Sequence, residues 1–134
     1  MTLQADPNRP VVAYRPRIVL ADDHNELREL LALRLRARGY DVHEASNGHE
    51  LFEALRRKPD LIISDLQMPG LSGIQVLERL RETDWTVPFI LMTGFPDATT
   101  HELANGLGTA YVFHKPLDLT HLVSTVEEII GSPA

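Results

Sequence analysis

Three aspartates, a threonine and a lysine are the residues whose types and placement point to chemistry. Each follows a short apolar run: Asp22 and Asp23 the first, Asp65 the third, Thr93 the fourth and Lys115 the fifth. Three carboxylates in one small site repel one another, so the site needs a cation or a protonated acid. Oxygen ligands without His or Cys favour a hard ion, and Mg²⁺ is the natural choice. With a lysine and a hydroxyl beside it, such a site predicts phosphoryl transfer to a carboxylate nucleophile.

The apolar runs alternate with segments of helical periodicity, and these are the elements that must position the polar residues. The runs cover residues 18–21, 40–45, 61–63, 87–92 and 110–113. The helical signals are a stripe of Leu27, Leu30, Leu31 and Leu35 ending at Gly39, capping boxes at Asn47–Glu50 and Ser72–Gln75, an N-cap at Asp118, and a weaker helix over 97–106. Five strands alternating with five helices predict an α/β fold, a doubly wound parallel sheet with helices on both faces. Ligands of such sheets bind beyond the carboxyl ends of the strands, where the polar residues lie.

The composition indicates one soluble globular domain. The 134 residues are 43% hydrophobic and 24% charged, and they include no cysteine, which excludes disulfides, thiolate metal sites and cysteine nucleophiles. Three prolines and little periodicity predict a loosely ordered leader over 1–16, followed by a domain over 17–131 and a tail over 132–134. No run approaches the ~20 apolar residues of a membrane span, and the N-terminus lacks the apolar core of a secretory signal. We therefore expect a cytoplasmic protein without a membrane partner.

The net charge of −6 is unevenly distributed along the chain. Residues 1–60 carry ten Lys and Arg and ten Asp and Glu, whereas residues 61–134 carry three and nine. Arg28, Arg34, Arg36 and Arg38 alternate with acids, which is typical of a solvated helix face rather than of a surface that neutralises phosphates. No direct nucleic-acid partner is expected. The six histidines include no pair spaced i, i+4, and we interpret them as surface or packing residues rather than zinc ligands.

From Arg17 to Gly131 the chain resembles the response-regulator receiver domain of two-component signalling. The matching motifs, in order, are Asp22-Asp23, Asp65-Leu-Gln-Met-Pro-Gly-Leu-Ser-Gly73, Thr93-Gly94 and Lys115-Pro116. The resemblance implies a flavodoxin-like sheet with strand order 2-1-3-4-5, as in single-domain chemotaxis regulators. It also implies a signalling phospho-acceptor rather than an enzyme, which receives its phosphoryl group from a histidine kinase or a histidine phosphotransfer protein and acts on an unknown downstream protein target.

The resemblance further assigns roles to the polar residues. Asp65 would be the phospho-acceptor. Asp23, Asp65 and the backbone carbonyl of Gln67 would bind Mg²⁺ directly, and Asp22 would act mostly through water. Thr93 and Lys115 would contact the phosphoryl oxygens. In this family the peptide bond between the lysine and the following proline is commonly cis.

The sequence departs from the family pattern at Val112, three positions before the lysine, where an aromatic residue is usual. Tyr111 and Phe113 flank it, but strand alternation directs them to the opposite face of the sheet. We therefore expect the signal to pass from Thr93 through residues 94–96 to the weak helix that follows, without an aromatic rotamer switch. Three residues follow Gly131, so the domain either works alone or belongs to a longer chain.

Two other functions remain open from the residues alone. An Asp-nucleophile phosphatase of the haloacid-dehalogenase type also uses Mg²⁺, but its motif is Asp-x-Asp, whereas position 67 is Gln, and a cap domain has no room here. A nucleotide- or flavin-binding module would have a glycine-rich turn after the first strand, where this chain has Asp22 and Asp23, whose charges repel phosphate.

Overall fold

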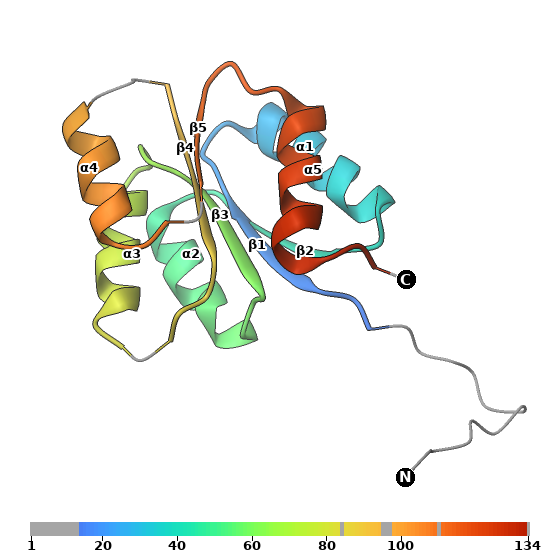
Figure 1. Cartoon of the computed structure of the whole chain (residues 1–134), viewed down its shortest axis with the longest axis horizontal. Coiled ribbons are helices and arrows are strands. Elements are labelled where there is room, and N and C mark those ends of the chain that lie inside the picture. Colours follow the sequence, from blue (N-terminus) through green and yellow to red (C-terminus); the bar gives the residue numbers. More distant parts are fainter. Residues whose placement is uncertain (1–13, 84, 95–97, 110, 134) are drawn as a thin grey trace, which may run out of the picture.

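The computed structural model of this chain describes residues 14–83, 85–94, 98–109 and 111–133. In these residues five strands alternate with five α-helices (Figure 1), and their bounds are β1 Arg17–Ala21, α1 Asn25–Ala37, β2 Asp41–Ala45, α2 Gly48–Ala54, β3 Leu61–Asp65, α3 Gly73–Arg81, β4 Phe89–Thr93, α4 Ala98–Gly106, β5 Tyr111–His114 and α5 Leu119–Ile130. A short 3₁₀ helix, η1 (Leu55–Arg57), continues α2. The strands form one parallel sheet in the order β2-β1-β3-β4-β5. The predicted fold class and strand order are confirmed.

Helices cover both faces of the sheet. Helices α1 and α5 lie on one side, and α2, α3 and α4 lie on the other (Figure 1). Alternate residues of one strand therefore enter different cores: Leu61 and Ile63 of β3 pack with α1 and α5, whereas Ile62 packs with α2 and α3. Because both faces are buried, the central strands read as continuous apolar runs. None of the described helices is long and apolar enough to cross a membrane.

The three predicted N-caps are confirmed, but only one of the two predicted capping boxes is complete, because the Glu50 side chain accepts from Ser46 and from the Asn47 amide instead of the Asn47 backbone. Ser72 and Gln75 form a complete capping box at the start of α3, with hydrogen bonds of 3.2 and 2.9 Å. Asn47 and Asp118 cap α2 and α5 by accepting hydrogen bonds from backbone N–H groups at 2.9 and 3.1 Å. After α1, Gly39 adopts a φ of +95°, in the left-handed region that glycine tolerates best.

Several predicted boundaries are wrong by one or two residues, and one stripe position is wrong. Strand β4 begins at Phe89 rather than at residue 87, because Pro88 has no N–H for the ladder and contributes only its carbonyl, which accepts from Ile62. Leu30 is 46% exposed, because the buried face of α1 consists of Leu31, Ala32 and Leu35. The start predicted for the fourth helix, residue 97, lies outside the described residues.

Only residues 14–16 of the predicted leader belong to the described part of the chain. There the Tyr14 hydroxyl donates to Asp60 at 2.7 Å, and the carbonyl of Pro16 accepts from the N–H of Asp41 at 3.0 Å. These contacts attach the chain before β1 to the sheet. The assignment of residues 1–16 to a leader remains a prediction.

Two glycines let the loop after β3 pack against its neighbours. A Cβ on Gly73 would lie 2.5 Å from the carbonyl oxygen of Asp65, and one on Gly48 would lie 2.0 Å from that of Leu71. Both distances are too short for real Cβ atoms, so the backbone approaches closely at both places. The N-terminus of α3 thus lies directly against the carboxyl end of β3, where the N–H of Gly73 donates to Leu66 at 3.0 Å.

Replacing Gly73 with Ala is expected to lower the free energy of unfolding by about 1–3 kcal/mol, because backbone atoms must separate to admit the methyl group. Gly106→Ala in α4 is the matched control, since a Cβ there meets nothing within 4 Å. That change should stabilise the protein by up to ~1 kcal/mol through helix propensity. Urea unfolding measures both values, and equal stability of the Gly73 variant and the native chain would contradict the close packing.

Candidate functional site

The polar residues predicted to act together meet at the carboxyl edge of the sheet. Asp22 directly follows β1, Asp65 ends β3, Thr93 ends β4 and Lys115 directly follows β5. Four different strands therefore supply the site, and their parallel register brings these ends to one edge. The backbone of Lys115 is fixed there by a 2.7 Å hydrogen bond from its N–H to the carbonyl of Thr93. Asp22, Asp65 and Thr93 are all buried.

Lys115 holds two of the carboxylates together. Its Nζ donates to Oδ2 of Asp22 and to Oδ2 of Asp65, each at 3.0 Å. The Asp22 side chain is fully buried, and those of Asp65 and Lys115 are 9% and 19% exposed. Two adjacent buried carboxylates would repel each other strongly, so the ammonium group is what allows both to be charged.

The second oxygen of each buried carboxylate is also held. Oδ1 of Asp22 accepts from the N–H of His24 at 2.8 Å, and Oδ1 of Asp65 accepts from the N–H of Gln67 at 3.3 Å. Both contacts run from a carboxylate to the backbone two residues later, a local turn that aspartate favours. The two carboxylates thus have the same arrangement, with one oxygen on the backbone and the other on Lys115.

Burial and charge act in opposite directions on the pKa values of this site. Burial raises the pKa of Asp65 above its ordinary value, the hydrogen bond from Lys115 opposes this, and the neighbouring charge of Asp22 raises it further. For Lys115, burial alone would lower the pKa, but the hydrogen bonds to Asp22 and Asp65 outweigh it, so the pKa is raised. Lys115 therefore remains charged.

Asp23 completes a cluster of three carboxylates. Ligand atoms of Asp22, Asp23 and Asp65 all lie within 4.8 Å of one another. Asp23 is exposed and the other two are buried, so the cluster opens to solvent on the side of Asp23. Three convergent oxygen donors suit a hard divalent cation. The acidic triad predicted from the sequence is confirmed as a cluster.

The loop after Asp65 is fixed by its own packing. Met68 is buried in the core between the sheet and α2 and α3, and the N–H of Gly48 approaches the carbonyl of Pro69 at 3.4 Å. The peptide bond between Lys115 and Pro116 is cis, as the family resemblance implies.

The strand alternation predicted around Val112 is confirmed. Val112 packs against the core shared with α3 and α4, whereas Phe113 enters the core with α1 and α5 and stacks edge-to-face on His121 at 5.3 Å. Tyr111, on that same face, is 45% exposed.

One pairing near the site was missed by the sequence analysis. Nε2 of His101 in α4 lies 2.7 Å from Nε2 of His114 in β5, a hydrogen bond between the two rings. The search for i, i+4 histidines could not find it, because thirteen residues and a chain reversal separate the partners. The sequence offers one signal for this pairing: the alternation of β5 directs His114 to the same face of the sheet as Val112.

Comparison with known proteins agrees with this geometry. Residues 18–127 match the family described as response regulator receiver domain. The chain is 32% identical over 115 residues to the response regulator receiver protein CpdR of Brucella abortus, covering 85% of this chain and 96% of that protein. It is 28% identical to sporulation initiation phosphotransferase F of Bacillus subtilis, covering 85% and 93%. A crystal structure of a response regulator receiver protein from Pseudomonas putida superposes with a TM-score of 0.81 at 30% identity, covering 87% of this chain and 99% of that one.

The fold and site define the class of the protein, a receiver domain that is a phospho-acceptor of two-component or phosphorelay signalling and not a classical enzyme. The chain belongs to the response regulator receiver domain family. Membership of this family decides against the phosphatase and flavin-binding alternatives.

Replacing Lys115 with Met is expected to lower the free energy of unfolding by about 3 kcal/mol at neutral pH, because it leaves two buried carboxylates without their counter-charge. Without the lysine, burial and the charge of Asp22 raise the pKa of Asp65 further, so protonation of Asp65 on acidification should relieve the repulsion. The deficit relative to the native chain should therefore shrink as the pH is lowered from neutral into the acidic range. Urea unfolding across this range tests it, with the exposed Lys58→Met as the control. A deficit independent of pH would contradict the role of Lys115 as the neutralising charge.

Proposed function

We propose that Asp65 is the residue that accepts the phosphoryl group. The observation that carries the proposal is its environment: a carboxylate at the end of a central strand, 6% exposed, held by Lys115 and within the acidic cluster. A carboxylate oxygen of Asp65 attacks the phosphorus atom of a phosphohistidine. The phosphorus–nitrogen bond breaks, the imidazole leaves, and Asp65 becomes an acyl phosphate.

The residues present fit a bound Mg²⁺ ion. Asp23 and Asp65, with the backbone carbonyl of Gln67, are the proposed direct ligands, and Asp22 acts mostly through water. Support comes from the all-oxygen donor set and from the 4.8 Å limit on the separation of the three carboxylates. When bound, the ion neutralises charge on the transferring phosphoryl group.

Lys115 and Thr93 have complementary proposed roles. Lys115, already in contact with Asp65, carries the positive charge that meets a phosphoryl oxygen. Thr93 ends the neighbouring strand and donates its hydroxyl to another oxygen. The change spreads from Thr93 through residues 94–96 toward α4, which contributes a single buried residue, Ala104, and is therefore a helix with little burial to resist movement. Residues 95–97 lie outside the described residues.

The phosphoryl donor we propose is a histidine kinase or a histidine phosphotransfer protein. Such donors draw on ATP, so we also propose that the protein works in the cytoplasm. Its output is a change in affinity for a downstream protein target rather than direct binding of nucleic acid.

Asp65→Asn should abolish covalent labelling by acetyl phosphate and Mg²⁺, because the amide cannot form an acyl phosphate. Intact-mass spectrometry and base treatment measure the label, which should be lost in base from the native chain. Label that persists in Asp65→Asn and resists base would place the modification on another residue and overturn the assignment.

Asp23→Asn should weaken Mg²⁺ binding at least tenfold, or about 1.4 kcal/mol, because it removes a charged ligand. Phosphorylation by acetyl phosphate should fall in parallel. Calorimetric titration provides the affinity, and Glu26→Gln, an exposed acid at the start of α1, is the matched loss of charge. Unchanged affinity in Asp23→Asn would place the ion elsewhere.

A further inference from the structure

A groove between α2 and α3 lies outside the phosphorylation site. Its apolar surface comes from Phe52 and Leu55 at the end of α2 and η1, Leu80 near the end of α3, and Trp85 beyond it. The cavity has a volume of about 520 Å³, within the range of protein sites that hold a ligand or an anchoring side chain. Phe52 is 41% exposed and Trp85 is partly buried, so both aromatic rings are accessible in this groove, named the α2–α3 groove below.

Two cations lie over the aromatic rings of the α2–α3 groove. Nζ of Lys58 is 5.4 Å from the centroid of Trp85, and the guanidinium of Arg79 is 5.8 Å from that of Phe52. Both cations are exposed, and neither makes an ion pair with a carboxylate within the described residues, whereas neighbouring Arg56 pairs with Glu53 at 3.7 Å. A cation–π interaction at an exposed ring contributes only about 0.5–1 kcal/mol. Lys58 and Arg79 can therefore leave the rings and pair with a carboxylate at little cost in free energy.

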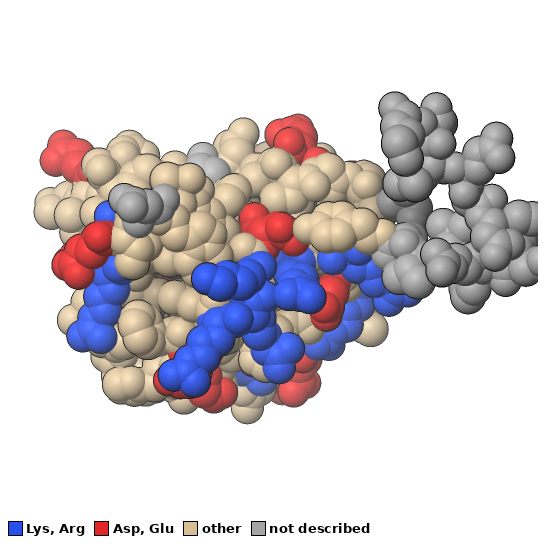
Figure 2. Space-filling view, turned by 90° about the horizontal axis from the view of Figure 1, so that it is seen from below, with Lys and Arg blue, Asp and Glu red and all other residues tan. Residues whose placement is uncertain are grey.

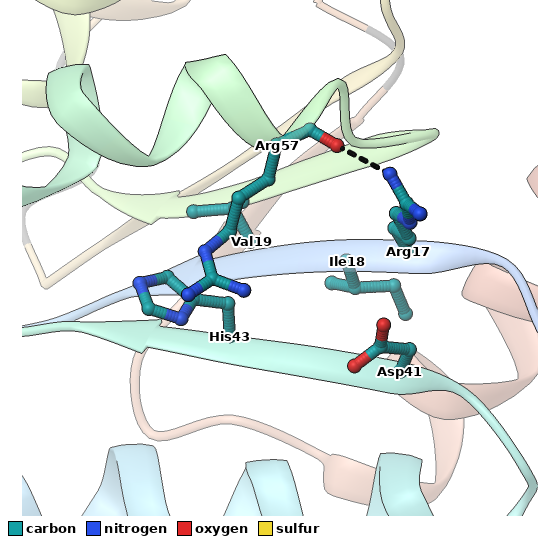
Figure 3. Close-up of a pocket in the computed structure, with 6 residues that line it drawn as sticks. All are labelled: Arg17, Ile18, Val19, Asp41, His43 and Arg57. Carbon is teal, nitrogen blue, oxygen red and sulfur yellow. Dashed lines mark hydrogen bonds between the residues drawn. The ribbon is translucent and has the colours of Figure 1, made fainter.

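The groove belongs to a basic end of the molecule. Lys and Arg side chains gather in the middle of the face viewed from below (Figure 2), and exposed Arg56, Arg57 and Lys58 follow one another in η1 and directly after it. The Arg17 side chain lies beside these residues, because its Nη1 donates a hydrogen bond to the carbonyl of Arg57 at 2.9 Å (Figure 3). The net charge of the chain is −6, so this end concentrates positive charge on an acidic protein and favours encounters with acidic partners.

The basic end lies opposite the phosphorylation site. Helices α2 and α3 begin beside the carboxyl ends of the strands, where Asp65 lies, and run back toward the starting ends of β1 and β4 (Figure 1). The α2–α3 groove is formed by the far ends of these helices, so a partner bound in it leaves Asp65 accessible to a phosphoryl donor.

We propose that the α2–α3 groove is a docking site for an acidic segment of a partner protein that carries a bulky apolar side chain. The apolar side chain packs on Phe52 and Trp85. The flanking carboxylates form ion pairs with Lys58 and Arg79, which leave the faces of the rings. Charge complementarity selects this occupant. Glu53 and Glu82 on the rim oppose a continuous phosphate backbone but leave room for separate carboxylates placed beside the two cations. The proposal does not depend on the identity of the phospho-acceptor.

The test uses the full chain and a set of acidic hexapeptides whose two central residues are Leu, Ile or Phe and whose other residues are Asp and Glu. Trp85 is the single tryptophan of the chain, so its fluorescence reports on the groove directly. At least one peptide should bind with a dissociation constant below 1 mM and shift this emission. Binding should weaken with salt, as expected for exposed charges. Peptides with Lys in place of the acids, or Ser in place of the central pair, should not bind.

Charge reversal supplies the matched comparison. Lys58→Glu and Arg79→Glu should each weaken binding at least fivefold, whereas Arg34→Glu, the same change on an exposed face of α1, should leave it unchanged. All three variants should still accept a phosphoryl group from acetyl phosphate, so failure of the docking proposal is separable from failure of the phospho-acceptor assignment.

The proposal is overturned by binding of acidic and basic peptides alike, by an equal effect of Arg34→Glu, or by no binding of any acidic peptide up to 1 mM. Preferential binding of polyuridine that is lost in Lys58→Glu and Arg79→Glu would also overturn it and assign the basic end to nucleic acid.

Discussion

The site depends on one ammonium group that bridges two buried carboxylates and cancels one of their two negative charges. Without Lys115, the burial of Asp22 and Asp65 side by side would oppose folding or force one of them to remain protonated. With it, both can be charged, and each keeps one oxygen on a backbone N–H. The cluster still carries excess negative charge. Asp23 adds a third carboxylate, and none of the described hydrogen bonds joins it to Lys115. The remaining negative charge is what a divalent cation would balance.

The sheet makes this arrangement possible because parallel strands end at a common edge. Asp22 and Lys115 are 93 residues apart in sequence, yet each directly follows a strand of the same sheet. Central strands buried on both faces fix the positions of these ends, and the close approach at Gly73 fixes the start of α3 against β3. The cores therefore fix the strand ends that carry the site, and the hydrogen bonds of Lys115 join the side chains at those ends.

Much of this could be predicted from the sequence, because its signals are local. Capping residues such as Ser72 and Asp118 act over three residues, and the apolar runs mark the strands directly. The order of polar residues after the runs predicts which side chains share the edge. The orientation of α1 is harder to predict, because five leucines within residues 27–35 offer overlapping stripes. Only packing against the sheet and α5 determines that Leu31 and Leu35 are buried while Leu30 is not. The pairing of His101 with His114 and the proximity of Lys58 to Trp85 depend on tertiary packing and leave no periodic trace.

The distribution of charge in space differs from its distribution along the chain. In sequence, the first sixty residues are neutral because basic and acidic residues balance. Folding separates part of this charge. Asp22 and Asp23 lie at the carboxyl edge with Asp65, and Arg57 and Lys58 lie at the opposite end beside Arg17. The separation is incomplete, because Asp60 accepts from the backbone of Arg17 at the basic end. Phosphorylation would add negative charge to the end that is already acidic, and a sheet buried on both faces lies between that end and the basic one. Exposed charges farther apart than the Debye length of about 8 Å are largely screened at physiological salt. A partner bound at the basic end would therefore stay bound whether or not the acidic end is phosphorylated. Binding of that partner and the phosphorylation state of the protein would then be independent of each other.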